Sequence, residues 1–371
     1  MKYYLISGEA SGDLHGSKLM EDIKLYDKLA EFRYWGGDKM KSQGGTRVKH
    51  YKNHSFMGFW EVFKNIYTIL KNIRFCKKDI LIFNPDVIIY IDYPGFNLKI
   101  AKWAKNNNFK NIFYISPQIW AWKENRINSI KRDIDQMYVI LPFEEDYYFK
   151  KHNHKVTYTG HPLTEIINAE NKINSADFLK SNNISSNIKI IALLPGSRKQ
   201  EIIKMLPLFV KVAQIFSDYK FIIAGSPGID SEFYDKFIKK SNVKIIIGNT
   251  YKILKISKAA IVTSGTATLE TALFNIPQIV CYKSSTLSYL IAKRIIKLKY
   301  ISLVNLIMDE NIVKEIIQHK FIIKNVAYEL NKVLNGEFRQ KQLSSYKRLN
   351  HKLNEFKIKD SLGKKITDFL K

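Results

Sequence analysis

The fold is decided by Ile191-Ala-Leu-Leu-Pro-Gly-Ser-Arg-Lys-Gln-Glu201, together with its later counterpart Thr263-Ser-Gly-Thr-Ala-Thr-Leu-Glu-Thr271. In each stretch a hydrophobic run that predicts a buried strand stops at a Gly/Ser turn and passes into a helical pattern. Free backbone N–H groups and the positive end of a helix dipole then face the end of the strand. Each stretch therefore predicts a place to hold phosphate.

Side chains in the two stretches extend this prediction to a nucleotide sugar. Arg198 follows Ser197 in the first loop and brings a planar cation with five donors. Glu270 lies one turn into the second helix, where a carboxylate can accept hydrogen bonds from a sugar diol. The second turn itself supplies three further candidate binding residues, Ser264, Gly265 and Thr266. A nucleotide diphosphate sugar would offer phosphates to the N–H groups of the loops and to Arg198, and a diol to Glu270.

The rest of the chain repeats the strand and helix alternation. A length of 371 residues fits two domains of about 150–200 residues, and we expect them at 1–164 and 165–371. Both halves predict an α/β fold with a doubly wound parallel sheet. Expected strands lie at 3–7, 32–36, 86–92, 110–115, 136–141 and 155–158, and then at 188–194, 219–224, 243–247, 259–263 and 278–282. Helical, charged segments follow from about residue 311.

Charge and cysteine content narrow the possible partners. The formal charge of +26 suggests nucleic acid or an anionic surface. Only nine of the 60 basic residues are Arg, and no Arg/aromatic cluster suits base stacking, so nucleic acid is not expected. Two distant cysteines predict neither a disulfide framework nor a zinc site, in keeping with a reducing cytoplasm. The sequence contains no uninterrupted run of about 18 apolar residues, so no membrane span is expected.

The first turn of the chain, Gly8-Glu-Ala-Ser-Gly-Asp13, joins a predicted buried strand to a helix. In a doubly wound domain that position faces the crevice at the carboxyl ends of the strands, where ligands bind. We therefore expect Glu9, Ser11 and His15 near a substrate. The alternative is that Ser11 or Asp13 only caps the helix.

Asp92 ends a strand that contains no other polar residue after Asp86. A carboxylate at the end of a central parallel strand can have its pKa raised by burial toward the value that a general base needs. The alternative is that Asp92 only satisfies backbone N–H groups of the Pro94-Gly95 turn. Asp133-Ile-Asp135 fits the letters of a metal motif, but it is more typical of a helix-to-strand connection, so no metal site is expected.

The segment 55–70 carries more apolar surface than one buried helix stripe requires. Its candidate membrane-facing residues are Phe56, Met57, Phe59, Trp60, Phe63 and Ile66. Lys52, Lys64, Lys71 and Arg74 surround them, a composition typical of a helix in a lipid interface. A core helix with lysines on its solvated face is the alternative.

Taken in order, the motifs resemble those of the lipid-A-disaccharide synthase family. They span residues 3 to about 305 and include Gly8–Asp13, Met57-Gly58, Ile91-Asp92, Phe96-Asn97, Ser116-Pro-Gln-Ile-Trp-Ala-Trp122, Leu141-Pro-Phe-Glu144, Gly160-His161, Leu194–Arg198, Ser264–Glu270, and Tyr300-Ile-Ser-Leu with Asn305. The resemblance implies a GT-B fold, with an acceptor lobe, a UDP-sugar lobe, a cleft between them, and C-terminal helices that return to the first lobe or swap between subunits.

The reaction that the resemblance implies is the inverting transfer of diacylglucosamine from UDP-2,3-diacylglucosamine to 2,3-diacylglucosamine 1-phosphate (lipid X), with release of UDP and without a cofactor. Asp92 matches the family's proposed base, and Arg198 and Asn305 match residues important for activity or nucleotide binding. The implied location is the cytoplasmic face of the inner membrane, with peripheral attachment. A homodimer is one arrangement that long polar C-terminal helices allow.

One position departs from the family pattern. Many members carry a second acidic residue three positions after the base, where this chain has Gly95, so base duty is assigned to Asp92 alone. Two alternatives stay open. One is another UDP-GlcNAc-dependent GT-B enzyme, such as a lipid II-type glycosyltransferase or a UDP-sugar epimerase, and the other is a peripheral membrane protein that binds nucleotide sugar without turnover.

Overall fold

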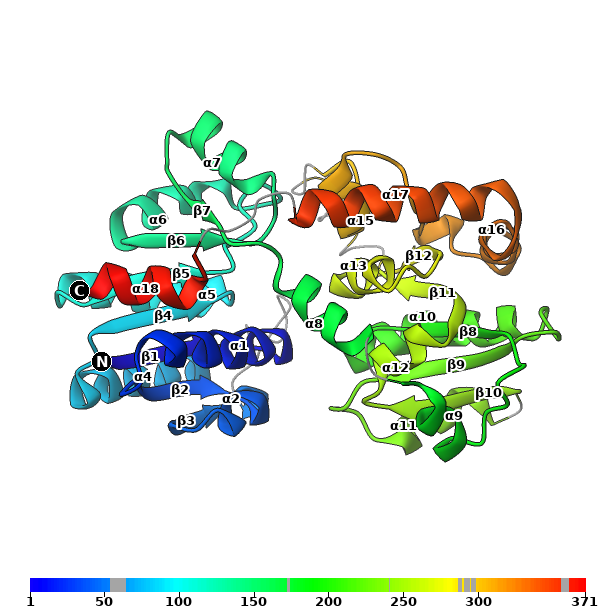
Figure 1. Ribbon diagram of the computed structural model, residues 1–371, viewed down its shortest axis with the longest axis horizontal. Coiled ribbons are helices and arrows are strands. Elements are labelled where there is room, and N and C mark those ends of the chain that lie inside the picture. Colours follow the sequence, from blue (N-terminus) through cyan, green and yellow to red (C-terminus); the bar gives the residue numbers. More distant parts are fainter. Residues whose placement is uncertain are drawn as a thin grey trace. The chain divides into compact units, whose positions relative to one another are not determined.

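The computed structural model describes residues 1–53, 65–171, 174–239, 241–285, 289, 294, 298–354 and 360–371. The chain divides into two units, one formed by residues 1–162 and 356–371 and the other by residues 163–355. The last helix, drawn in red in Figure 1, thus belongs with the N-terminal elements.

The first unit contains a seven-stranded parallel sheet with the order β3-β2-β1-β4-β5-β6-β7. Its strands are β1 (Lys2–Ser7), β2 (Glu31–Gly36), β3 (Thr46–His50), β4 (Val87–Ile91), β5 (Lys110–Tyr114), β6 (Gln136–Val139) and β7 (Thr157–Tyr158). Its helices are α1 (Ala10–Tyr26), α2 (Asp38–Ser42), α4 (Ile66–Phe83), α5 (Pro94–Asn106), α6 (Ile127–Asp133), α7 (Glu144–His152) and α18 (Leu362–Leu370), with short 3-10 turns η1 (Tyr51–Asn53) and η2 (Glu124–Arg126).

Apolar residues fill both faces of this sheet, as the unbroken hydrophobic strands require. Tyr4 and Ile6 of β1 pack with α4 and α5 on one face, whereas Tyr3 and Leu5 pack with α1 and α18 on the other. Gly363 of α18 lies so close to α1 that an added Cβ would be 2.6 Å from a backbone carbon of that helix. The C-terminal helix is therefore part of the core of the first unit.

The second unit contains a six-stranded parallel sheet with the order β10-β9-β8-β11-β12-β13. Its strands are β8 (Ile190–Leu194), β9 (Lys220–Gly225), β10 (Val243–Ile247), β11 (Ser257–Thr263), β12 (Gln278–Tyr282) and β13 (Lys314–Ile317). Its helices are α8 (Pro162–Asn171), α9 (Ala176–Ser181), α10 (Lys199–Ala213), α11 (Ser231–Ile238), α12 (Thr250–Lys255), α13 (Thr266–Leu273), α15 (Leu303–Met308), α16 (Ile323–Leu334) and α17 (Gly336–Asn354), with a 3-10 turn η3 (Gln318–Lys320). The prediction of two doubly wound parallel sheets is confirmed.

Candidate functional site

The strand order of the first sheet reverses between β1 and β4, which is the usual ligand-binding position of doubly wound folds. Ser7 at the end of β1 pairs with Ile91 at the end of β4. Glu9 and Asp92 each follow one of these strand ends by one or two residues. The topology therefore brings two carboxylates, predicted separately from sequence, to the same edge of the sheet.

The backbone is strained at this edge. Asp92 has a φ of 49°, Tyr93 of 50° and Ile115, at the end of the neighbouring strand β5, of 65°. Left-handed backbone is uncommon for non-glycine residues and a genuine outlier for a β-branched one. Gly8 leaves room for Tyr93, because a Cβ at Gly8 would be 2.4 Å from a carbon of that ring. Strain that the surrounding fold maintains at adjacent strand ends is typical of functional sites.

The electrostatic surroundings of Asp92 suit a general base. Its side chain is only partly exposed, and burial raises its pKa to about 7, with a further upward contribution from the charge of Glu9. The backbone N–H of Tyr93 and the charge of Arg126 act in the opposite direction. A carboxylate with a pKa near neutrality is available as base at physiological pH and still accepts a proton readily.

The loop beside Asp92 is anchored by Glu144, the first residue of α7. This side chain is 1% exposed and accepts hydrogen bonds from the hydroxyl of Ser116, from Nε1 of Trp120 at 3.1 Å and from the backbone N–H of Leu141 at 3.0 Å. Burial raises its pKa, while these donors favour its ionised form. Glu144 therefore fixes the loop that follows β5 to the end of β6.

The helix after β1 holds the other residues expected near the substrate. Ser11 is exposed at the start of α1, and His15 is 5% exposed. Burial lowers the pKa of His15 to about 4 and that of His161 to about 3, and the charge of His15 further lowers the pKa of His161. Both imidazoles are therefore neutral at physiological pH.

Asp13 has a structural role. Its carboxylate accepts hydrogen bonds from the backbone N–H groups of Gly37 at 2.6 Å, Lys39 at 3.0 Å and Met40 at 3.0 Å. The alternative to a ligand contact was that Asp13 caps its own helix, α1. The structure instead shows Asp13 capping α2.

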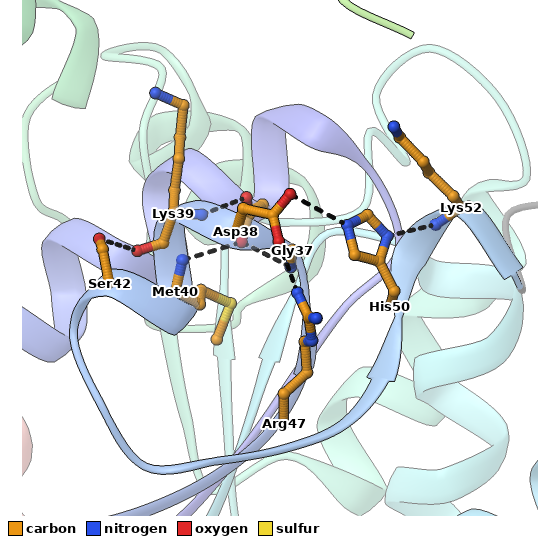
Figure 2. Close-up of polar contacts among 9 residues, drawn as sticks. Gly37, Asp38, Lys39, Met40, Ser42, Arg47, His50 and Lys52 are labelled. Carbon is orange, nitrogen blue, oxygen red and sulfur yellow. Dashed lines mark hydrogen bonds and ion pairs between the residues drawn. The ribbon is translucent and has the colours of Figure 1, made fainter.

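Contacts at α2 and β3 hold the far edge of the sheet. Figure 2 shows Asp38 between Arg47 and His50, at 2.7 Å from an Arg47 nitrogen and 3.7 Å from Nε2 of His50. The other ring nitrogen of His50 accepts the backbone N–H of Lys52 at 3.1 Å. These interactions attach a short, partly exposed strand to the sheet.

The second sheet reverses its strand order between β8 and β11, and the two predicted phosphate loops follow these strands. Gly196 has a φ of 112°, and an added Cβ would be 2.4 Å from a carboxylate oxygen of Glu201. The same carboxylate accepts the backbone N–H of Ser197 at 3.1 Å and lies 3.8 Å from Arg198. Arg198 is half exposed. Glu201 therefore shapes the first loop from within the first turn of α10.

The second loop presents an open turn at the start of α13. Gly265 has a φ of 144°, and a Cβ there would meet no atom within 4 Å. Thr266 begins the helix and is exposed, whereas the hydroxyl of Ser264 donates to the carbonyl of Ile301 at 2.8 Å. The backbone at Gly265 and Thr266 is thus accessible, and Ser264 ties the loop to a later segment.

Glu270, one turn into α13, accepts a hydrogen bond from the hydroxyl of Tyr251 at 3.0 Å. Burial raises the pKa of Glu270, and the Tyr251 hydroxyl opposes this rise. The bond occupies one carboxylate oxygen and orients the side chain.

Asn305, predicted to matter for activity or nucleotide binding, makes internal contacts. Its side chain is fully buried and donates to the carbonyl of Val313 at 2.9 Å and to Glu315 at 3.0 Å, while it accepts the N–H groups of Ile312 and Val313, both at 2.9 Å. These four bonds use all its donors and acceptors. The arrangement argues against direct nucleotide contact and for a positioning role.

Glu315 completes that arrangement. Its carboxylate also accepts the backbone N–H groups of Ile301 and Ser302 and the hydroxyl of Ser302, at 2.9–3.1 Å. Ser302 in turn caps α15. Sequence reasoning did not identify Glu315, Glu201 and Tyr251 as supports of the candidate loops in the second unit. Near Asp92 in the first unit, it did not identify Arg126. Glu201 ends the first quoted stretch and contacts Ser197 four residues earlier, so its position was a local signal, whereas Glu315, Tyr251 and Arg126 belong to no local pattern that marks their roles.

Comparison with known proteins now identifies the family. A sequence profile described as lipid-A-disaccharide synthetase matches residues 3–366. The lipid-A-disaccharide synthase of Syntrophus aciditrophicus is 35% identical over 366 residues, covering 97% of this chain and 93% of that protein. The chain belongs to the lipid-A-disaccharide synthase family. The synthase of Coxiella burnetii (strain CbuG_Q212) is 32% identical over 371 residues, covering 99% and 98% of the two chains.

Solved structures share the two-sheet fold. UDP-GlcNAc 2-epimerase from Neisseria meningitidis, bound to UDP-GlcNAc, superposes with a TM-score of 0.65 at 11% identity, covering 100% of this chain and 99% of that chain. A glycosyltransferase from Rickettsia africae gives a TM-score of 0.55 at 12% identity, covering 100% and 97%. The predicted GT-B fold is confirmed, and membership of the synthase family, a glycosyltransferase family, distinguishes this chain from the epimerases.

The expected membrane-facing residues lie almost entirely outside the described part of the chain. Phe56, Met57, Phe59, Trp60 and Phe63 are not described, whereas Ile66 is 55% exposed at the start of α4. Among the described residues, no helix has the length and apolar character needed to cross a bilayer. In the same residues, no group of three His, Cys, Asp or Glu side chains is placed to hold a metal ion.

Proposed function

We propose that the protein joins UDP-2,3-diacylglucosamine to 2,3-diacylglucosamine 1-phosphate, forming the β-1,6-linked disaccharide 1-phosphate and releasing UDP. Family membership supports the reaction class. The single structural observation that carries the assignment of roles is Asp92, a carboxylate with a pKa near 7 on strained backbone at the switch point of the first sheet.

Asp92 is the base in this proposal. It takes the proton of the acceptor's 6-hydroxyl as that oxygen attacks C1 of the donor sugar, and the bond from C1 to the diphosphate breaks on the opposite face. One displacement inverts the configuration at C1, so a β-linkage forms from an α-linked donor. Glu9 keeps the pKa of Asp92 high by charge repulsion, which strengthens it as a proton acceptor.

The second unit binds the donor and stabilises the leaving group. Backbone N–H groups at Gly265 and Thr266, at the positive end of α13, and the half-exposed guanidinium of Arg198 are donors suited to a diphosphate whose negative charge grows in the transition state. Glu270, oriented by Tyr251, accepts hydrogen bonds from the ribose diol. Asn305 and Glu315 position the segment to which Ser264 is bound.

Peripheral attachment to the cytoplasmic face of the inner membrane belongs to the same proposal. The first turns of α4 expose Ile66, Tyr67 and Leu70 at 55%, 77% and 47%, next to the exposed cations Lys71 and Arg74. Apolar side chains flanked by cations suit an anionic lipid interface. Replacing Tyr67 and Leu70 together by Ser should reduce sedimentation with anionic vesicles, and unchanged sedimentation would contradict this attachment.

The test of the reaction is acceptor-dependent release of UDP. Purified protein with both acylated sugars in detergent should release one UDP for each disaccharide formed. UDP release without disaccharide would indicate donor hydrolysis, and no release would contradict the proposed transfer.

A further inference from the structure

Two cations near Asp92, Lys123 and Arg126, have no role in the transfer reaction proposed above. Lys123 and Arg126 flank Trp122 in the loop between β5 and α6, with the ammonium nitrogen of Lys123 4.6 Å and the guanidinium carbon of Arg126 5.2 Å from the ring centroid. Trp122 is 41% exposed. Within the described part of the chain, neither cationic head group forms a hydrogen bond or an ion pair.

The loop that carries this group starts next to the base. Strand β5 pairs with β4, and the N–H of Asp92 donates to the carbonyl of Tyr114 at 3.1 Å, so the loop begins at the strand end adjacent to Asp92. Glu144 fixes its first half through Ser116 and Trp120. The far half, including Lys123 on left-handed backbone with a φ of 53°, is thereby held at this edge of the sheet.

The two cations are held together at an energetic cost. Burial lowers the pKa of both Lys123 and Arg126, and the charge of Arg126 lowers that of Lys123 further. The charge of Asp92 acts on Arg126 in the opposite direction, which places the guanidinium within electrostatic reach of the base. Paired cations on an aromatic ring are suited to a compact dianion, because a guanidinium binds two phosphate oxygens and an ammonium a third.

We propose that Trp122, Lys123 and Arg126 form the binding site for the phosphate monoester of the acceptor sugar. This inference rests on the proposed function, in which the acceptor reacts through its 6-hydroxyl, on the CH2 group carried by C5, and bears phosphate at C1, the other carbon that flanks the ring oxygen. The anion site must then lie near the base without contacting it. Arg126 meets this condition, because its charge acts on Asp92 although no ion pair between the two is found among the described residues, and Lys123 lies beside it on the same ring. Trp122, which is 41% exposed, offers the sugar ring an apolar surface.

The experiment compares two acceptors, 2,3-diacylglucosamine 1-phosphate and the same sugar without phosphate. Lys123→Gln and Arg126→Gln are assayed at pH 8.5, above the pKa of about 7 of Asp92, so that loss of the Arg126 charge has less effect on the ionisation of Asp92. Each variant should raise KM for the phosphorylated acceptor roughly 10- to 100-fold. KM for the dephosphorylated acceptor should change less than threefold. Lys102→Gln, which removes an exposed cation from α5, is the matched control and should leave both values unchanged.

Other outcomes overturn the inference in distinguishable ways. Equal losses on both acceptors would mean that the cations only support the fold or the base, and no loss would place the phosphate elsewhere. A loss of sedimentation with anionic vesicles, with unchanged KM values, would assign the cations to a lipid headgroup. Failure of the wild-type protein to release UDP with either acceptor would instead contradict the proposed function.

Discussion

Replacing Asp92 by Asn should abolish activity and stabilise the fold. Asn has the size of Asp but cannot take a proton, so kcat should fall roughly 10²- to 10⁴-fold. The affinity for UDP should stay within a few-fold, because the residues proposed to bind the donor belong to the second unit and Asp92 to the first. The variant should gain stability because burial in the folded protein disfavours the charged form of Asp92. The same effect raises the pKa of Asp92 and makes it suitable as a base.

The size and pH dependence of this gain can be worked from the pKa. The folded value is about 7 against an ordinary value of 3.8, and each unit corresponds to about 1.4 kcal/mol, which sets an upper limit of about 4 kcal/mol. Solvent reaches part of the side chain, so we expect about 2 kcal/mol. Because the unfolded carboxyl ionises first, wild-type stability falls as pH rises from about 4 to 7. The advantage of Asn should therefore be near zero at pH 4 and complete above pH 7.

Tryptophan fluorescence suits this measurement, because all five Trp residues lie between positions 35 and 122 of the sequence, within the range 1–162 of the first unit. Urea unfolding of both proteins is followed at pH 5, 6, 7 and 8, and UDP release is measured in parallel. Asp146→Asn is the matched control, since Asp146 is an exposed carboxylate of α7 paired with Lys150 at 2.8 Å. It should keep full activity and show no comparable pH-dependent gain.

Two results would refute this reasoning. A variant that keeps most of its activity would place the base elsewhere, with Glu9 and His15 as the next candidates. A variant that is inactive but no more stable at pH 8 than the wild type would show that the fold does not hold Asp92 at a raised pKa.

Three further changes test other parts of the structure. Glu9→Gln removes a charge that raises the pKa of Asp92, so the acid limb of the pH profile of kcat/KM should move to lower pH; an unmoved limb would show that the two carboxylates are not coupled. Glu270→Gln should raise KM for the UDP-sugar roughly tenfold with little change in kcat, and an unchanged KM in steady-state kinetics would remove it from the donor site. Gly363→Val should destabilise the first unit by about 2–4 kcal/mol, because its side chain would overlap the backbone of α1. Fluorescence-monitored unfolding tests this change against Gly95→Ala, where an added Cβ meets open space; equal stability of the two variants would contradict the packing of α18.

The central strands and the loops after them could be predicted because their signals are local. The run at residues 188–194 predicted the strand Ile190–Leu194, and the glycine that follows it has the positive φ that the turn requires. Strand β3 (Thr46–His50) and strand β13 (Lys314–Ile317) were missed. Each is the last strand at one edge of its sheet as formed by the described residues, and charged residues interrupt the apolar run in both.

Apart from Glu201, which contacts Ser197 four residues earlier, the supports of the candidate site could not be predicted, since they join residues far apart in the sequence. Glu144 reaches Ser116 across 28 positions, and Glu315 reaches Ser302 across 13. Asn305 was predicted from its motif to matter for activity or nucleotide binding, and its four side-chain hydrogen bonds, all internal, could not be read from that motif. Motifs predicted the candidate site, but only the structure separated side chains that are exposed from those that hold the loops through internal hydrogen bonds.

The most direct test of the central claim is a parallel measurement of UDP and disaccharide 1-phosphate formed by the wild-type protein and by Asp92→Asn at pH 8, with both acylated sugars at saturation. We predict that the wild type forms the two products in equal amounts, and that the variant forms neither at an appreciable rate while it binds UDP with nearly unchanged affinity. Disaccharide formation by the variant at a rate close to that of the wild type would contradict the assignment of Asp92 as the base.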